Sequence, residues 1–219
     1  GVSRLVHISA IGADVDAESD YARTKGEGEA AILQHRPDAM ILRPSVIFGA
    51  EDGFFNRFAA MTPFTLVLPI AGGDTKFQPV HVDDVAHAAA LGVEGQANGV
   101  FELGGPHVAT FRELMKDMLG VIRRRRMVFN MPFWLARFVA WVFRVVQIVS
   151  LGLIKPALTQ DQVKALRVDN VVASDAKGFD DLGIRPASME AILPDYLWRF
   201  RPSGQYAAIK ESAKNIRAQ

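Results

Sequence analysis

Two short apolar runs on either side of a helical stretch constrain the fold of this chain most. The runs are residues 4–9 and 39–43, and between them a polar loop leads into a predicted helix from about Ser19 to Gln34. Strand, helix and strand in this order are typical of a parallel α/β sheet, which binds ligands where its strands end. Ser9 closes the first run and Pro44 follows the second. The sequence therefore predicts a binding edge at these two residues.

Tyr21 and Lys25 stand four residues apart on the predicted helix. At this spacing both side chains lie on one face, about a turn from each other. A nearby ammonium favours the ionised form of a phenol, and the Ser9 hydroxyl can hydrogen-bond the same substrate oxygen. The trio can therefore donate or remove a proton during hydride transfer. The other interpretation is an ordinary polar pair on an exposed helix surface.

Several motifs resemble those of extended and atypical short-chain dehydrogenase/reductases. A narrower set resembles the NADPH-binding accessory subunits of respiratory complex I, and the resemblance covers about residues 3–200. The broader set is Ser9 with Tyr21 and Lys25, LRPSVIFG at 42–49, QPVHVDDVA at 78–86 and FELGGP at 101–106; the narrower set is FGAEDGFFNRFA at 48–59, LTQDQV at 158–163 and DDLGI at 180–184.

This resemblance implies an α/β fold: the C-terminal part of a Rossmann-type domain followed by a small, mainly helical C-terminal lobe. It implies NADPH as cofactor, held by Ser9, Tyr21 and Lys25, with the backbone of Pro44, Ser45 and Val46 lining the nicotinamide pocket. In an accessory subunit the catalytic trio Ser9, Tyr21 and Lys25 would be vestigial. The implied partners are other subunits of the peripheral arm and the membrane junction. The implied location is the inner membrane, on its cytoplasmic face in bacteria or its matrix face in mitochondria.

The phosphate-binding glycine loop of a Rossmann domain is absent from this sequence. Gly26-Glu27-Gly28 has the right letters but lies inside the predicted helix and follows no strand, so we interpret it as a chance match. We expect that roughly the first half of the nucleotide-binding domain is not in this chain. The residues that choose between NADP and NAD belong to that half.

The bulk composition narrows the class of protein. The net charge is +1 with 49% hydrophobic residues, which argues against a disordered chain or a nucleic-acid binder. With no cysteine, the chain has no disulfide and no thiolate metal site. The acidic and histidine residues at 81–87 are explained by helix capping and solvation, so no metal site is predicted. Asp83 is the expected N-cap there.

The composition changes sharply after residue 122. Four arginines, Arg123, Arg124, Arg125 and Arg126, precede an apolar stretch from Phe133 to about Ile154, with Pro132 expected as its first helical residue. On a helix, Arg137 and Arg144 share a side with two alanines, whereas Trp134, Phe138, Trp141 and Val145 form an adjoining apolar face. We expect Arg123–Arg126, Trp134, Arg137, Trp141 and Arg144 to contact the membrane surface or a partner.

The predicted helix could lie in the headgroup plane of a membrane, span the membrane, pack on a partner protein or belong to the core of this protein. A true span is disfavoured by Arg144, because an arginine at mid-helix costs about 2.5–3.5 kcal/mol on insertion scales. A helix packed on a partner protein and an ordinary core helix remain open. Tryptophans at a boundary beside a polybasic run are typical of interfacial helices.

The remaining sequence predicts caps and boundaries. We expect Thr110, Thr159 and Ser188 to cap helices, and residues 63–69 to form a loop. The predicted division is 1–122 for the Rossmann-type part, 123–201 for the helical lobe and 202–219 for a polar tail.

Three functions are consistent with these residues. The first is a non-catalytic, NADPH-binding accessory subunit of complex I. The second is an active NAD(P)-dependent reductase or epimerase that uses Tyr21 and Lys25. The third is a membrane-surface scaffold that has lost its nucleotide.

Overall fold

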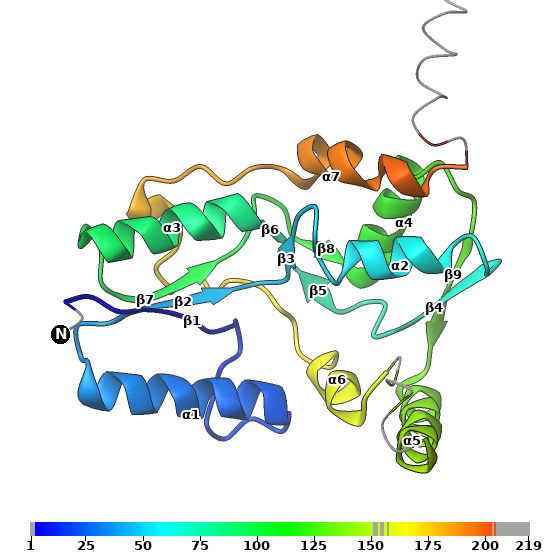
Figure 1. The fold of residues 1–219 in the computed structure, drawn as a ribbon, viewed down its shortest axis with the longest axis horizontal. Helices are drawn as coiled ribbons and strands as arrows, with labels where there is room; N and C mark the ends of the chain where they lie inside the picture. Colours follow the sequence, from blue (N-terminus) through cyan, green and yellow to red (C-terminus); the bar gives the residue numbers. More distant parts are fainter. Residues whose placement is uncertain (1–2, 151–152, 154–155, 157, 203, 205–219) are drawn as a thin grey trace, which may run out of the picture.

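Three parallel strands form the central sheet of the protein. A computed structural model describes residues 3–150, 153, 156, 158–202 and 204. The strands are β1 (Val6–Ile8), β2 (Met40–Pro44) and β7 (Gly99–Leu103), in the order β1-β2-β7. Helices α1 (Asp20–His35) and α3 (Val82–Glu94) cover opposite faces of this sheet (Figure 1). A parallel sheet covered on both faces explains why β2 is apolar almost throughout.

A buried ion pair joins α1 to the sheet. Arg43 of β2 donates from Nε and Nη2 to the carboxylate of Glu29 on α1, at 2.9 and 2.6 Å. A second carboxylate, Glu102 of β7, lies 3.6 Å from Arg43 Nη1. The Glu29 contact raises the pKa of Arg43, which therefore stays charged. This ion pair attaches the middle of α1 to the central strand of the sheet.

A second core, separate from the central sheet, is built around phenylalanines. Rings of Phe54, Phe58, Phe77 and Phe111 contact one another edge to face or tilted, with centroids 5.5–6.0 Å apart. Beside the central sheet and its two helices, the chain forms β3 (Ile47–Phe48), α2 (Phe55–Met61), β4 (Val67–Ala71), β5 (Lys76–Phe77), β6 (Val80–His81), β8 (Ala109–Thr110), α4 (Phe111–Val121), β9 (Met127–Met131) and α7 (Met189–Leu197), with short 3-10 turns at Asp180–Leu182 and Trp198–Phe200.

Helix α5 (Phe133–Val149) lies at one end of the molecule, next to α6 (Gln160–Ala165) (Figure 1). Its inner face is made of small residues: Ala136 and Ala140 are buried with Val163 of α6 and Ala71 of β4. Among the described residues, no helix is long and apolar enough to cross a membrane.

Two of the three predicted hydroxyl caps make capping hydrogen bonds, and in both the third helical residue is Glu or Gln. Thr110 and Thr159 form complete capping boxes with Glu113 and Gln162. Ser188 occupies the N-cap of α7, but its side chain makes no capping hydrogen bond.

Three local predictions are wrong. Helix α3 begins at Val82, so its N-cap is His81, and Asp83 lies in the first turn. Pro132 is the N-cap of α5, one residue before the expected position. Residues 67–69 belong to β4, which pairs in parallel with β9, although a loop was expected. A loop was expected because Pro69 is unusual in a strand; a strand with one partner tolerates it.

The predicted domain boundaries stay predictions. Most of the predicted polar tail, 203 and 205–219, lies outside the described residues, as do 151–152 and 154–155 at the expected end of the apolar stretch.

Gly26 and Gly28 of α1 differ in what a side chain would contact. A Cβ at Gly26 would lie 2.5 Å from the backbone carbon of Asp14, whereas at Gly28 the nearest atom, Nε2 of His7, is 3.9 Å away. The loop before α1 therefore packs directly on the helix at Gly26.

We predict that Gly26→Ala lowers the free energy of unfolding by about 1–3 kcal/mol, because the loop backbone must move. The control Gly28→Ala is expected to raise it by about 0.5–1 kcal/mol through helix propensity. Denaturant unfolding of both variants measures the difference. Equal effects would contradict the close packing at Gly26.

Candidate functional site

The ends of β1, β2 and β7 are held together by backbone hydrogen bonds that continue beyond the strands. The N–H of Ser9 donates to the Leu42 carbonyl at 2.7 Å, and the N–H of Ile11 donates to Pro44 at 3.0 Å. The N–H of Ser45 donates to Leu103 at 2.8 Å. Ser9, Pro44 and Ser45 thus gather at the carboxyl edge of the sheet, where the sequence predicted a binding edge.

Ser9 presents an unsatisfied hydroxyl at this edge. The residue is only 3% exposed. Among the described residues its Oγ has no hydrogen-bond partner. A buried polar atom without a partner is costly and marks a place where a ligand or water completes the contact.

Lys25 reaches from α1 to the same edge, and Tyr21 lies one turn before it on the helix. The Lys25 ammonium donates to the carbonyl of Ile8, at 3.1 Å, directly before Ser9. Tyr21 is 54% exposed. Partial burial raises the pKa of its phenol above the usual value, which is the reverse of the lowering expected from a neighbouring ammonium. In this arrangement the phenol is therefore a neutral hydrogen-bond donor throughout the neutral pH range.

Ser45 and Val46 are held by a residue that the sequence did not single out. Asn170 accepts through Oδ1 from the Ser45 hydroxyl at 2.7 Å and from the Val46 N–H at 3.1 Å. Their polar groups are thereby used within the protein, and Pro44 has no N–H to offer. Pro44, Ser45 and Val46 would therefore present backbone and apolar atoms, rather than free polar side chains, to a bound ligand.

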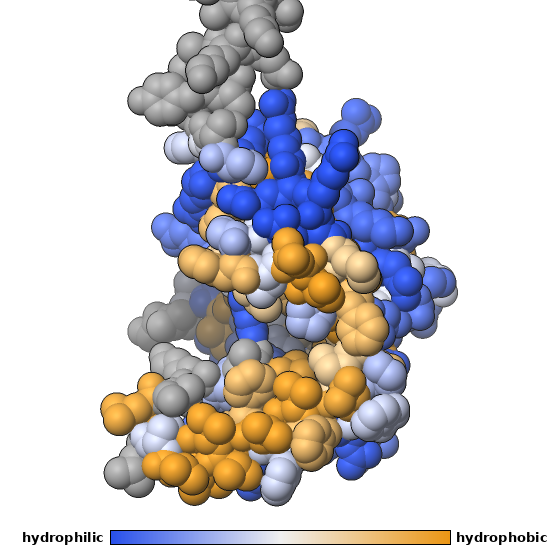
Figure 2. Space-filling model, turned by 90° about the vertical axis from the view of Figure 1, so that its right-hand side faces the viewer, coloured by the Kyte–Doolittle hydropathy of each residue, from blue (hydrophilic) through white to orange (hydrophobic). Residues whose placement is uncertain are grey.

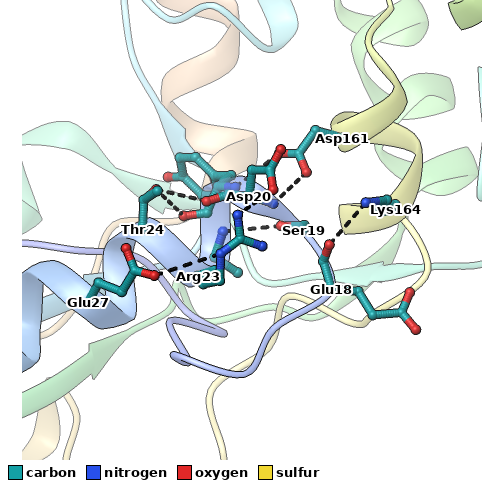
Figure 3. A network of polar contacts seen from close by, with 10 residues as sticks. Glu18, Ser19, Asp20, Arg23, Thr24, Glu27, Asp161 and Lys164 are labelled. Atoms are coloured by element: carbon teal, nitrogen blue, oxygen red, sulfur yellow. Dashed lines mark hydrogen bonds and ion pairs between the residues drawn. The ribbon is translucent and has the colours of Figure 1, made fainter.

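The first turn of α1 is completed by a carboxylate from α6 (Figure 3). Asp161 accepts from the N–H groups of Asp20 and Tyr21, at 2.6 and 3.0 Å, and the Ser19 hydroxyl accepts from Ala22 at 3.1 Å. Asp161 is 141 residues from Asp20. The sequence predicted the start of α6 correctly from Thr159, but no local signal gives the contact of Asp161 with α1.

The predicted contact surface for a membrane or partner faces outward. Trp134 is 70% exposed and Trp141 55%, with exposed Phe138, Val145 and Ile148 beside them. Arg137 and Arg144 are also exposed. Figure 2 shows apolar side chains gathered over this end of the molecule, with strongly hydrophilic residues above them.

The four consecutive arginines differ in their contacts. Arg124 donates from Nε to the carbonyl of Phe200, and Arg126 to that of Thr62, both at 2.9 Å. The arginines line an open depression of about 760 Å³ together with Lys116, Leu119, Gly120 and Met127. Arg123 adopts a left-handed backbone with φ of 53°, which turns the chain between α4 and β9.

Comparison with known proteins supports the predicted resemblance. The chain is 36% identical over 210 residues to NADH dehydrogenase [ubiquinone] 1 alpha subcomplex subunit 9 of Arabidopsis thaliana, covering 93% of this chain and 52% of that protein. The same subunit of Rattus norvegicus is 34% identical, covering 92% and 52%. The chain is a homologue of these complex I subunits.

This homology confirms the resemblance that the sequence motifs predicted. The chain spans about half the length of the curated relatives it matches. No protein-family model matches it.

A solved structure confirms the α/β, Rossmann-type fold class. The dTDP-glucose 4,6-dehydratase of Streptomyces venezuelae, with NAD and TYD bound, superposes with a TM-score of 0.62 at 20% identity, covering 91% of this chain and 60% of that one. At this identity the similarity concerns the fold. The predicted site residues therefore stay a prediction for this complex I homologue.

We predict that the phenol of Tyr21 ionises only above the ordinary pKa of 10.0. The measurement is the near-ultraviolet phenolate absorbance as the pH is raised, as the difference between the intact protein and Tyr21→Phe. A Tyr21-dependent signal in the neutral range would instead indicate a catalytic phenol poised near working pH.

Proposed function

We propose that this chain is the rear part of a non-catalytic, NADPH-binding accessory subunit of respiratory complex I, which stabilises the peripheral arm at its membrane junction. The observation that carries the proposal is the 36% identity to subunit 9 over 93% of the chain. An enzyme that shares only the fold would not be expected to match this subunit along nearly the whole sequence.

The residues at the sheet edge fit a nicotinamide nucleotide. The buried, unpartnered Ser9 hydroxyl and the Tyr21 phenol supply hydrogen bonds, and Lys25 supplies a positive charge at the end of β1. Pro44 with Ser45 and Val46 would form the wall of the nicotinamide pocket. The phosphate-binding glycine loop would come from strands added beside β1, which is an edge of the described sheet. NADPH is a hydride donor when bound.

The trio offers hydrogen bonds to a nucleotide without any chemical step. Burial raises the pKa of the Tyr21 phenol, which can therefore donate a hydrogen bond at neutral pH. The Lys25 ammonium donates to the Ile8 carbonyl, directly before Ser9. Absence of turnover is supported by the similarity to subunit 9 and is tested by the next prediction.

We predict that Tyr21→Phe in the intact complex leaves the NADH:ubiquinone oxidoreductase rate within about twofold of wild type, because no step depends on the phenolic proton. Bound NADPH is measured by extraction and fluorescence. Ser9→Ala, which removes the unpartnered hydroxyl, is expected to lower NADPH retention more than the rate. Oxidation of the bound NADPH by a carbonyl compound, lost in Tyr21→Phe, would support the active reductase or epimerase instead.

We further propose that the apolar face of α5, defined as Trp134, Phe138, Trp141, Val145 and Ile148, lies in the headgroup layer of the inner membrane. The face would be on the matrix side in mitochondria or the cytoplasmic side in bacteria. The helix contains no acidic residue, and Arg137 and Arg144 border the face. An exposed apolar stripe edged by cations is typical of interfacial helices.

The neighbouring strands extend this surface. Phe64, Leu66, Met127 and Phe129 are exposed on or beside β4 and β9, and β9 leads directly into α5. Exposed Arg123 and Arg125 add positive charge toward anionic lipid. Other complex I subunits would cover the exposed apolar residues of this surface that the lipid does not contact.

We predict that Arg137→Gln with Arg144→Gln lowers binding of the intact protein to vesicles containing anionic phospholipid roughly thirtyfold, since each of the two basic residues near the surface contributes about 1 kcal/mol. Cosedimentation measures this. Arg185→Gln, an exposed arginine in the segment before α7, is the matched control.

Two results would count against the lipid contact. One is binding that does not distinguish anionic from neutral vesicles. The other is normal vesicle binding of the double variant combined with failed assembly of the complex, which would point to a protein partner.

A further inference from the structure

The segment from Thr159 to Asn170, here called the connector, contacts two parts of the predicted nucleotide edge: the first turn of α1, which carries Tyr21, and the loop with Ser45 and Val46. It begins beside α5, continues as α6 past the start of α1 and ends at Ser45 and Val46 (Figure 1). We infer that the connector positions Tyr21 for the nucleotide through Asp161 and couples nucleotide binding to α5. The inference rests on the proposed function and deepens it.

The first contact of the connector is with α5. Val163 is buried against Ala136 and Ala140. The amide of Gln160 donates to the backbone carbonyl of Arg137, at 2.8 Å. Since alanines allow close approach, a shift of α5 relative to the sheet must be passed to α6 or open this contact.

The second contact is with the helix that carries Tyr21 and Lys25. The Asp161 carboxylate accepts from the N–H groups of Asp20 and Tyr21, and the Lys164 ammonium donates to the Glu18 carbonyl at 3.1 Å (Figure 3). The first N–H groups of a helix have no partner inside it, and a negative charge there is favoured by the helix dipole. Asp161 therefore fixes the backbone of Tyr21 itself.

The third contact is with the opposite wall of the predicted site. Leu166 accepts from the Thr75 hydroxyl at 2.5 Å, which anchors the connector behind α6. Asn170 then holds Ser45 and Val46. One short segment thus sets the position of α1 on one side and of the loop after β2 on the other.

Thermodynamic linkage gives this arrangement a measurable consequence. If a nucleotide orders the first turn of α1, it also stabilises the Asp161 contact and with it the seat of α5 on α6. By reciprocity, anything that holds α5 in place favours nucleotide binding. The nucleotide would then stabilise the contact of α5 with its surroundings, without any chemical step.

The test is amide hydrogen exchange of the intact protein with and without NADPH, in wild type and Asp161→Asn. Wild type is expected to show slower exchange with NADPH in residues 20–25, 160–165 and 136–140. Asp161→Asn loses the charge but keeps the size, so protection should be lost in 160–165 and 136–140. NADPH should also bind up to about fivefold more weakly, because asparagine keeps one acceptor oxygen but loses the second acceptor and the negative charge at the helix N-terminus. Asp195→Asn, an exposed carboxylate on α7, is the control.

If Asp161 had only a structural role, Asp161→Asn would lower the melting temperature, but NADPH would still slow amide exchange in residues 160–165 and 136–140. NADPH-dependent protection of 160–165 that persists in Asp161→Asn would overturn the inference, as would wild-type protein that binds NADPH without any change in 160–165. If Asp161→Asn does not fold, Lys164→Met carries the same test, because it removes the contact with Glu18. Wild-type protein that binds no NADPH would overturn the proposed function, and this inference with it.

Discussion

The structure depends on the way its parallel strands end. The ladder between β1, β2 and β7 continues through the N–H groups of Ser9, Ile11 and Ser45 after the strands themselves have stopped. These bonds pull three chain segments, far apart in sequence, to one edge. Every residue proposed to hold the nucleotide is either on this edge or on the helix that leads away from it.

The position of α1 over that edge is fixed from two directions. From the sheet, Arg43 holds Glu29 in the middle of the helix. From α6, Asp161 holds its first turn. A helix attached by a buried ion pair alone could still pivot about it. With a second attachment at its N-terminus, the turn that carries Tyr21 has one orientation relative to Ser9.

The sequence predicted the elements whose causes are local. Ser19, Thr110 and Thr159 mark helix starts because a hydroxyl satisfies an N–H two or three residues later. The prediction of Asp83 as the N-cap of α3 was wrong because an acidic residue is also favourable in the first turn of a helix, where Asp83 lies. Because aspartate is favourable both at the N-cap and in the first turn, Asp83 alone does not fix the first residue of α3.

The contacts that the sequence could not predict are all long-range. The pairing of β4 with β9 joins segments about sixty residues apart and includes Pro69, so no periodicity in either segment announces it. Asp161 and Asn170 look like ordinary loop and helix residues until the chain folds back. The strand ends at Ser9 and Pro44, in contrast, were predicted from two local apolar runs, and the structure places both residues at one edge of the sheet.

The alanine seam between α5 and α6 has a consequence for copies of this protein that have no partner. The alanines themselves bury little area, and Val163 with the partly buried Met131, Phe133, Leu158 and Leu166 supplies most of the apolar contact at this seam. The tryptophans of α5 meanwhile face outward. A copy without a partner therefore exposes the apolar face of α5 to water, which is the kind of surface that chaperones and quality-control proteases recognise.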